Sequence, residues 1–397
     1  MAPLIGAKFF PQHSVNMSTL YTLMVFSAGF ICRPLGGILF GHYGDTRGRA
    51  KALRISVLII SLPTLLIGIM PSYETIGILA PILFTTLRLV QGLSIGGEYS
   101  GVMIYLAESA PANRRGFITS FAAFGANLGF LLATLLYLLL HLFATADTIR
   151  DWAWRLPFIL AGLPGSIVIY YRFQLTETHV YQNLKAKQHL EVKPFLAAIK
   201  YAPYQLLKIL GMTCMGSAFY YIFFGYMPTY LERFMGFPLK TALLIQICSL
   251  VGMLFLVPLA GLCGDYFSRK NMLIITAMGI ILLVLPCFYL LQTNTILAIV
   301  FALGIAVVLS SLEQGNTLIA IVENCPENVR YSGIAFAYNL GNALFGGTAP
   351  LVVTLLTESI DSLAPAYYLI LMGGVSLVTA TTLLGKNKHL GVVRSKS

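Results

Sequence analysis

Charged residues are scarce in this sequence of 397 residues. Lys, Arg, Asp and Glu make up 10% of the chain, against about 25% in an average soluble domain. Acidic residues are the rarer kind, because 15 Asp and Glu accompany 26 Lys and Arg, and 57% of the chain is hydrophobic. A soluble protein of this length needs more polar residues to cover its surface. The composition therefore excludes a soluble enzyme and a nucleic-acid-binding protein.

Residues that would hold a metal, a nucleotide or a disulfide framework are few or wrongly spaced. The six cysteines form no C-x-x-C pair, and the six histidines show no ligand spacing. No basic segment followed by a cleavage site precedes the first apolar stretch, so no signal peptide is expected. We expect no cofactor, no metal site and no catalytic residue.

Long apolar stretches account for the mean hydropathy of +0.80. Eleven of them are long enough to cross a bilayer as helices, which satisfy their own backbone hydrogen bonds in lipid. The sequence therefore predicts an all-α membrane protein surrounded by the lipid bilayer. The predicted spans are residues 18–41, 52–70, 76–107, 117–141, 152–171, 209–231, 241–264, 272–291, 296–322, 334–357 and 364–385.

The basic residues are concentrated in alternate loops. With the loop at 41–52 in the cytoplasm, 19 of the 26 Lys and Arg fall on the cytoplasmic side, 5 fall outside and 2 lie within spans. This asymmetry follows the positive-inside rule. It predicts a multi-pass protein of the inner (plasma) membrane with its C-terminus in the cytoplasm, and it explains the net charge of +11 without nucleic acid.

Two different loop motifs each occur twice, in the same order. The pattern G-x-x-G-D-x-x-x-R begins at Gly41 and again at Gly261, 220 positions later. The pattern E-x-x-P begins at Glu108 and again at Glu323, 215 positions later. Two motifs repeated at nearly one offset predict two homologous halves, as in many secondary transporters.

The repeat also predicts how the chain is divided. We expect an N-terminal helical bundle at 1–173, a cytoplasmic linker at 174–204 and a C-terminal bundle at 205–397. The second half has two spans before its aspartate loop, whereas the first half has one. Two six-helix bundles are therefore predicted, with the first helix missing and residues 1–11 as its end.

The repeated loops and several further motifs resemble those of the major facilitator superfamily, and within it the metabolite:proton symporters. The resemblance implies the major facilitator fold, a monomer, and proton-coupled uptake of a small osmolyte or metabolite of the proline or glycine betaine type by alternating access. The further motifs are Arg33-Pro-Leu-Gly-Gly37, Pro71-Ser-Tyr-Glu-Thr-Ile-Gly77, Arg88 to Tyr99, Arg114-Arg-Gly-Phe117, Trp154-Arg-Leu-Pro-Phe158, Tyr226-Met-Pro-Thr-Tyr230 and Arg330-Tyr-Ser332.

Two alternatives stay open beside osmolyte uptake. Relatives in the family carry organic acids, so a symporter of dicarboxylates, citrate or aromatic acids is the first. A transport-dead or receptor-like remnant without its first helix is the second. The resemblance is also imperfect, because Ser268 replaces a glycine of the second aspartate loop. Addition of an upstream acidic, aromatic helix is expected to restore or increase uptake.

Four ionisable residues, Arg33, Arg88, Glu98 and Glu313, lie within predicted spans. Such groups are costly in lipid and usually face a cavity or a partner, although a side chain near the membrane edge can also extend to water. Glu98 and Glu313 are repeat mates 215 positions apart. The resemblance places both on helices along the central cavity.

The repeat suggests different roles for these two carboxylates. Arg33 and Glu98 lie at similar depth, so we expect an ion pair between them. The repeat mate of Arg33 is Met253, which leaves Glu313 without a matching cation. A buried carboxylate without a cation is the better candidate for binding and releasing a proton. A permanently neutral Glu313 that only hydrogen-bonds neighbouring amides is the alternative.

Three further residues are candidates for contact with the substrate. Arg88 lies ten residues before Glu98, about 15 Å along the same helix, and could hold a substrate carboxylate or couple to the missing first helix. Tyr220 and Tyr221 could hold a quaternary ammonium through their ring faces. Plain packing is the alternative for both tyrosines.

The two aspartate loops are predicted to form a gate. Asp45 and Asp265 follow the ends of predicted spans, and Arg49 and Arg269 are their expected local partners. Each aspartate could also meet the N-terminus of a neighbouring helix, whose dipole favours anions. Contacts that form in one state and break in the other would permit alternating access.

Overall fold

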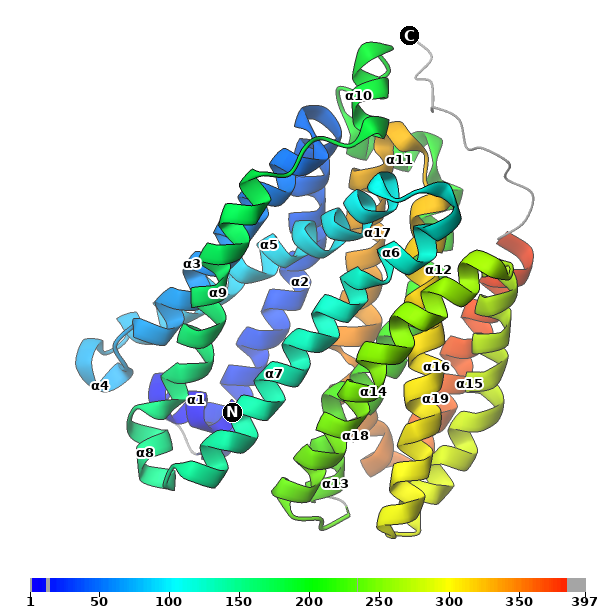
Figure 1. Ribbon diagram of the computed structural model, residues 1–397. Coiled ribbons are helices and arrows are strands. Elements are labelled where there is room, and N and C mark those ends of the chain that lie inside the picture. Colours follow the sequence, from blue (N-terminus) through cyan, green and yellow to red (C-terminus); the bar gives the residue numbers. More distant parts are fainter. Residues whose placement is uncertain (1, 12–14, 234, 384–397) are drawn as a thin grey trace.

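The protein is helical over almost all of the residues that its computed structural model describes, which are 2–11, 15–233 and 235–383 (Figure 1). Eleven helical segments among these residues are long and apolar enough to cross a membrane. The predicted all-α membrane architecture and its number of spans are therefore confirmed. The tail at 384–397, predicted to lie in the cytoplasm, is outside the described residues.

The first half of the chain contributes five of the membrane-spanning segments, and short helices complete it. Pro34 and Pro63 lie inside long helices of this half, as membrane helices tolerate where neighbouring groups satisfy the freed carbonyls. Its α-helices are α1 (Ala2–Phe9), α2 (Val15–Arg47), α3 (Arg49–Ile69), α4 (Tyr73–Ile76), α5 (Leu79–Ser109), α6 (Arg115–Thr119), α7 (Phe121–Phe143), α8 (Ala146–Asp151) and α9 (Leu156–Phe173).

The second half contributes six membrane-spanning segments, and π-helical turns occur in three of them, the last being the π-helix η6 (Thr379–Leu383). Two short helices, α10 (His179–Ala186) and α11 (Pro194–Tyr201), lie in the predicted linker. The others are α12 (Pro203–Tyr220), the π-helix η3 (Tyr221–Tyr226), α13 (Met227–Arg233), α14 (Leu239–Tyr266), α15 (Arg269–Gln292), α16 (Ile296–Glu323), α17 (Arg330–Gly341), the π-helix η5 (Asn342–Gly347), α18 (Ala349–Ser359) and α19 (Ala364–Val378).

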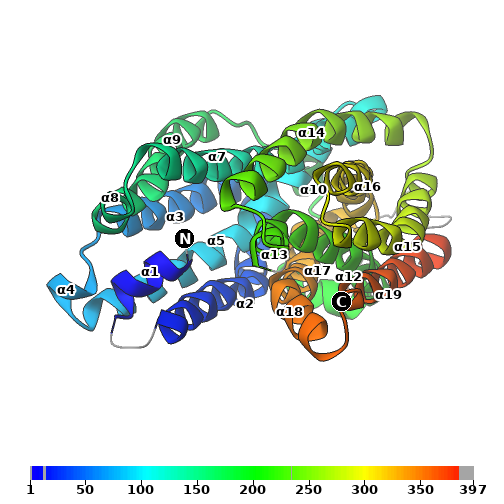
Figure 2. The ribbon, with the colours of Figure 1, turned by 90° about the horizontal axis from the view of Figure 1, so that it is seen from below.

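The helices form two groups that meet along a seam. Figure 2 shows helices α1 to α5 and α7 to α9 on one side and α12 to α19 on the other. Helices α2 and α7 of the first group contact α17 and α14 of the second. We call the end of the molecule that carries α10 and α11 the linker end, and the opposite end, where α8 and α13 lie, the far end (Figure 1).

Close backbone approach holds α2 against α17 near the linker end. A Cβ atom on Gly41 would lie 2.5 Å from the Cα atom of Ser332, which is closer than real Cβ atoms approach one another. The absence of a side chain at this position therefore lets the two halves meet, because backbones pack closely where residues are small.

The predicted loop at 41–52 is almost entirely helical, which corrects the sequence interpretation. Helix α2 continues to Arg47 and α3 begins at Arg49, so Gly48 alone separates them. Gly48 has φ of +118°, a conformation that residues with a side chain rarely adopt. Glu177 makes this short connection possible, because its carboxylate accepts hydrogen bonds from the first amides of α3.

Candidate functional site

Asp45 joins the two halves at the linker end. Its carboxylate accepts hydrogen bonds from the backbone amides of Tyr331 at 3.1 Å and Ser332 at 2.9 Å, in the first turn of α17. Arg49 lies 3.1 Å from the same carboxylate, and both side chains are fully buried. The unsatisfied amides and the dipole of a helix N-terminus favour such an anion.

Asp265 makes the repeat-related contact in the opposite direction. It accepts hydrogen bonds from the backbone amides of Gly116 at 2.8 Å and Phe117 at 2.9 Å, at the start of α6. Arg269 lies 2.9 Å from Asp265 and also pairs with Glu323. The predicted local partners of both aspartates are thus present, and each aspartate binds the other half of the molecule.

A second group of charged side chains lies beside the contact between Asp45 and α17. Arg330 forms a 3.0 Å ion pair with Glu108 across the seam, and Arg49 lies 3.6 Å from the same carboxylate. Arg49 also donates to the backbone carbonyl of Glu327 at 2.9 Å. Because Glu108 and Arg49 are both buried, loss of either side chain would leave the other as a buried charge with one partner fewer, which destabilises the fold.

The linker is attached to the segment that carries Asp45 through Tyr181. Its hydroxyl donates to the backbone carbonyl of Thr46 at 2.9 Å. Burial, and secondarily the carboxylate of Glu177, raise the pKa of Tyr181 above its usual value. The hydroxyl therefore stays protonated and keeps its hydrogen bond at physiological pH.

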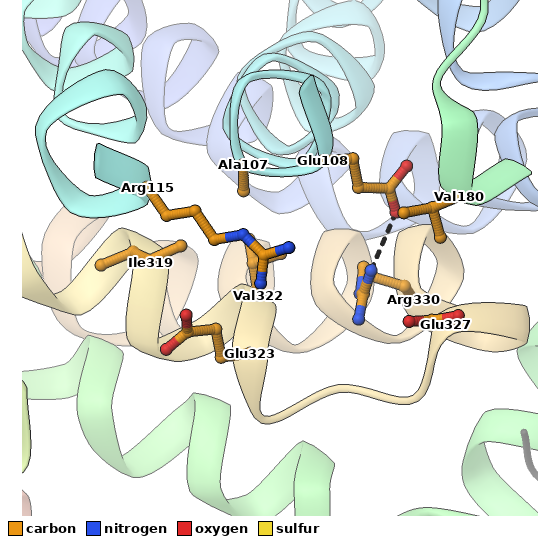
Figure 3. Close-up of a pocket in the computed structure, with 9 residues that line it drawn as sticks. All are labelled: Ala107, Glu108, Arg115, Val180, Ile319, Val322, Glu323, Glu327 and Arg330. Atoms are coloured by element: carbon orange, nitrogen blue, oxygen red, sulfur yellow. Dashed lines mark hydrogen bonds and ion pairs between the residues drawn. The ribbon is translucent and has the colours of Figure 1, made fainter. Parts of the chain in front are cut away.

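A cavity of about 60 Å³ lies between the halves at the same end. Figure 3 shows Glu108 paired with Arg330 on one side of it, and their repeat mates Glu323 and Arg115 on the other. Arg115 makes no ion pair within the described residues, and its Nε atom is buried without an acceptor. The ion pair between Glu108 and Arg330 is therefore formed, whereas the repeat-related pair between Glu323 and Arg115 is not.

Glu98 has a different partner from the one predicted. It pairs with Arg172 at 2.5 Å and accepts a hydrogen bond from Ser56. The predicted pair with Arg33 is wrong, because the face of α5 that meets α2 carries Gly96. Two residues further along, Glu98 is rotated by about 200° and faces α3 and α9.

The two predicted intramembrane arginines have aromatic neighbours, and neither forms an ion pair within the described part of the chain. The guanidinium of Arg33 lies 3.8 Å from the ring centre of Phe30. Arg88 lies 5.4 Å from the ring centres of both Phe84 and Phe158. Cation–π attraction thus takes the place of a counterion at both positions.

Glu313 lies at the seam, inside the second half. Its side chain is buried and packs so closely against α12 that a Cβ atom on Gly216 would overlap its carboxylate. Tyr99 from α5 and Tyr338 from α17 are close enough to interact with it electrostatically. Among the described residues Glu313 forms no ion pair, as the repeat predicts for a helix without a matching cation.

Aromatic rings from both halves meet at the seam, and two of them, Tyr99 and Tyr338, lie near the Glu313 carboxylate. Tyr220 packs edge-on against Phe130, with ring centres 5.7 Å apart, and Tyr221 packs in the same way against Phe30 at 5.5 Å. Tyr99 and Tyr338 stack across the halves at 5.6 Å. We call these six rings the aromatic seam: Phe30, Tyr99, Phe130, Tyr220, Tyr221 and Tyr338.

The structure brings together some predicted residues and adds others. Glu313, Tyr220 and Tyr221 lie at one seam, whereas Glu98 and Arg88 lie within the first half. Sequence analysis missed Tyr338 and Arg172 as site residues. No sequence signal identified Tyr338, because a tyrosine in an apolar helix resembles any packed aromatic residue.

Comparison with known families identifies the chain's relatives. The sequence pattern described as Major Facilitator Superfamily matches residues 4–350. The chain is 36% identical over 397 aligned residues to the proline/betaine transporter of Escherichia coli (strain K12), covering 96% of this chain and 78% of that protein. It is also 36% identical to the glycine betaine/proline/ectoine/pipecolic acid transporter OusA of Dickeya dadantii (strain 3937), covering 96% and 77%.

Solved structures with the same fold include sugar carriers. The proton:xylose symporter XylE bound to 6-bromo-6-deoxy-D-glucose superposes with a TM-score of 0.76, covering 96% of this chain and 89% of that one at 18% identity. An inward open conformation of the xylose transporter XylE from E. coli superposes with a TM-score of 0.65, covering 98% and 92% at 19% identity. At these identities the likeness shows the fold alone.

Proposed function

The chain belongs to the Major Facilitator Superfamily, and on this premise we propose that it takes up a small zwitterionic osmolyte of the proline or glycine betaine type together with a proton. Relatives named as transporters of proline, glycine betaine, ectoine and pipecolic acid support this substrate class. The proposed carrier is a monomer in the inner membrane, with bundles at 1–173 and 205–397 joined by the linker at 174–204.

The closed gate at the linker end is the observation that carries the proposal. The positive-inside distribution supports a cytoplasmic position for this end, and in that orientation the described conformation is closed toward the cell interior. Asp45 and Asp265 each bind the amides of a helix in the other half. Release of both contacts would let the halves rock apart at this end, as alternating access requires.

Glu313 is the proposed proton carrier. It is a buried carboxylate at the meeting of the two halves, and no cation compensates it within the described residues. An uncompensated charge at this position is costly in a dry seam. Protonation of Glu313 would therefore favour closure around the substrate, and ionisation would favour an open, hydrated state.

Replacement of Glu313 by glutamine tests the proposal. A neutral glutamine mimics the protonated carrier, which can cycle while loaded but cannot release a proton. In proteoliposomes, Glu313→Gln should exchange internal for external glycine betaine yet fail to accumulate it against its gradient. Glu74→Gln is the control, because Glu74 is an exposed carboxylate of α4, and it should accumulate substrate normally.

The outcomes separate this function from its alternatives. Accumulation by Glu313→Gln at the rate of the unaltered chain would refute proton transfer through this carboxylate. Competition by citrate or dicarboxylates, with none by proline or glycine betaine, would select the organic-acid symporter. A chain that is correctly inserted but inert with every substrate would select the transport-dead remnant.

A further inference from the structure

Two polar groups around the aromatic seam have buried atoms without a hydrogen-bond partner among the residues described, and two charged groups there lack a counterion. Glu313 has no counterion and Arg33 has none either. The hydroxyl of Tyr220 and the Nε atom of Arg33 are buried without any hydrogen-bond partner. Buried polar groups in folded proteins are almost always satisfied. A cation and a hydroxyl left unpaired near the same rings therefore point to a bound ligand with complementary groups.

The rings between these groups are arranged to receive a cation. Tyr220 and Tyr221 stand perpendicular to each other, with ring centres 5.7 Å apart and planes at 90°. Tyr338 lies within electrostatic range of both. In this perpendicular contact the edge of one ring covers a face of the other, and the ring faces outside the contact attract a cation within about 6 Å.

Arg33 contacts the ring of Phe30, which in turn packs against Tyr221. Its guanidinium packs on Phe30 at 3.8 Å, and the Phe30 ring packs edge-on against Tyr221 at 5.5 Å. Phe30 thus contacts both groups, so the Arg33 guanidinium lies at most 9.3 Å from the ring centre of Tyr221. A short zwitterion can span this distance when its ammonium lies on the tyrosine ring and its carboxylate meets the guanidinium.

The helices that carry the rings are irregular at this level. The π-helix η3 begins at Tyr221, and the π-helix η5 of the neighbouring segment covers Asn342–Gly347. A Cβ atom on Gly346 would lie 2.7 Å from the Tyr221 ring, and one on Gly347 would lie 2.9 Å from the Phe30 ring. Because π-helical turns are frequent at functional sites, two of them against the same rings support a binding role.

We infer that the aromatic seam binds a quaternary ammonium group on the rings of Tyr220, Tyr221 and Tyr338, while Arg33 binds the carboxylate of the same zwitterion. This inference rests on the proposed uptake of osmolytes and names the groups that recognise them. Glu313 is protonated when the seam is occupied, so the rings rather than a carboxylate hold the positive charge.

Binding to the purified full chain in lipid nanodiscs tests the inference. Glycine betaine should displace radiolabelled glycine betaine at least about tenfold more effectively than 3,3-dimethylbutanoate, which replaces the charged nitrogen by carbon at nearly the same shape. Choline keeps the ammonium but lacks the carboxylate, and it should also compete weakly. In Arg33→Gln the preference for glycine betaine over choline should disappear.

Ring substitutions supply the second part of the test. Tyr221→Leu should weaken glycine betaine binding by about tenfold, whereas Tyr221→Phe keeps the ring face and should weaken it by less than about threefold. Tyr289→Leu is the matched control, because Tyr289 lies 54% exposed on α15, and binding should not change.

Equal displacement by glycine betaine and its carbon isostere would overturn the inference, and this comparison needs no variant. Unchanged binding by Tyr221→Leu would overturn it as well. If uptake of glycine betaine persists in either case, the proposed function stands and only the assignment of its site fails. If the unaltered chain binds neither glycine betaine nor proline, both are contradicted.

Discussion

Glu177 reaches from the start of the linker to the first turn of α3, where it accepts hydrogen bonds from the amides of Arg49 at 2.9 Å and Ala50 at 3.2 Å. This carboxylate occupies the space beside Gly48, where a Cβ atom would overlap it. Position 48, the last variable position of the G-D-x-x-x-R motif, is therefore a glycine in the first copy for two physical reasons. Its backbone is left-handed, and a charged group lies against its Cα atom.

Replacement of Gly48 by alanine should destabilise the protein by about 1–3 kcal/mol, because φ of +118° is strained for any residue with a side chain. A lower midpoint of thermal unfolding in detergent would show this. Gly125→Ala is the control, since it has open space around it in a regular helix, and it should be neutral or slightly stabilising. Equal stability of Gly48→Ala and Gly125→Ala would refute the account of this turn.

The partner of Glu98 can be tested by double-mutant cycles. Glu98→Gln should destabilise the chain by about 1–3 kcal/mol, because it leaves Arg172 without its anion. Removal of both charges should cost less than the sum of the single changes, whereas Glu98 and Arg33 should show additive effects. Thermal unfolding of the single and double variants gives both coupling energies. Strong coupling between Glu98 and Arg33 would contradict the observed pairing.

The elements themselves were largely predictable, but their contacts were not. Apolar length predicts the spans, because only helices of about 20 residues cross lipid. Short sequence separation predicts the pairs Asp45–Arg49 and Asp265–Arg269, and in the structure each pair spans the break between two consecutive helices. The partner of Glu98 was not predictable, because depth in the membrane says nothing of rotation about the helix axis. Tyr338 was missed for a similar reason: its role depends on which helix faces it.

The two repeat-related aspartate contacts, which we propose as gates, differ in burial, and this difference should appear in transport. Asp45 and Arg49 are fully buried, whereas the Arg269 side chain is 22% exposed and also pairs with Glu323. Asp45→Asn should weaken the closed gate by about 1–3 kcal/mol and slow substrate exchange by about tenfold. Asp265→Asn should slow it less, because the partly exposed Arg269 side chain can be solvated by water, whereas the buried Arg49 cannot. Exchange assays in proteoliposomes decide between these outcomes. Normal exchange by Asp45→Asn would leave this residue with a purely topogenic role.

At the scale of the whole molecule, the account depends on which side of the membrane the linker end faces. The 19 basic residues assigned to the cytoplasm motivate the proposed orientation. Reporter fusions after Gln188 should therefore signal from the cytoplasm, and fusions after Ser72 or Thr293 from outside. An external signal at Gln188 would place the linker end outside, and the described conformation would then be closed toward the exterior.

The central claim is that a proton gradient drives osmolyte uptake through this chain. The most direct measurement is uptake of radiolabelled glycine betaine into proteoliposomes that hold the purified full chain. With an acidic exterior, internal glycine betaine should rise above its external concentration, and a protonophore should collapse the accumulation to equilibrium. Uptake that never exceeds equilibrium under this gradient, or accumulation that the protonophore leaves unchanged, would contradict the account.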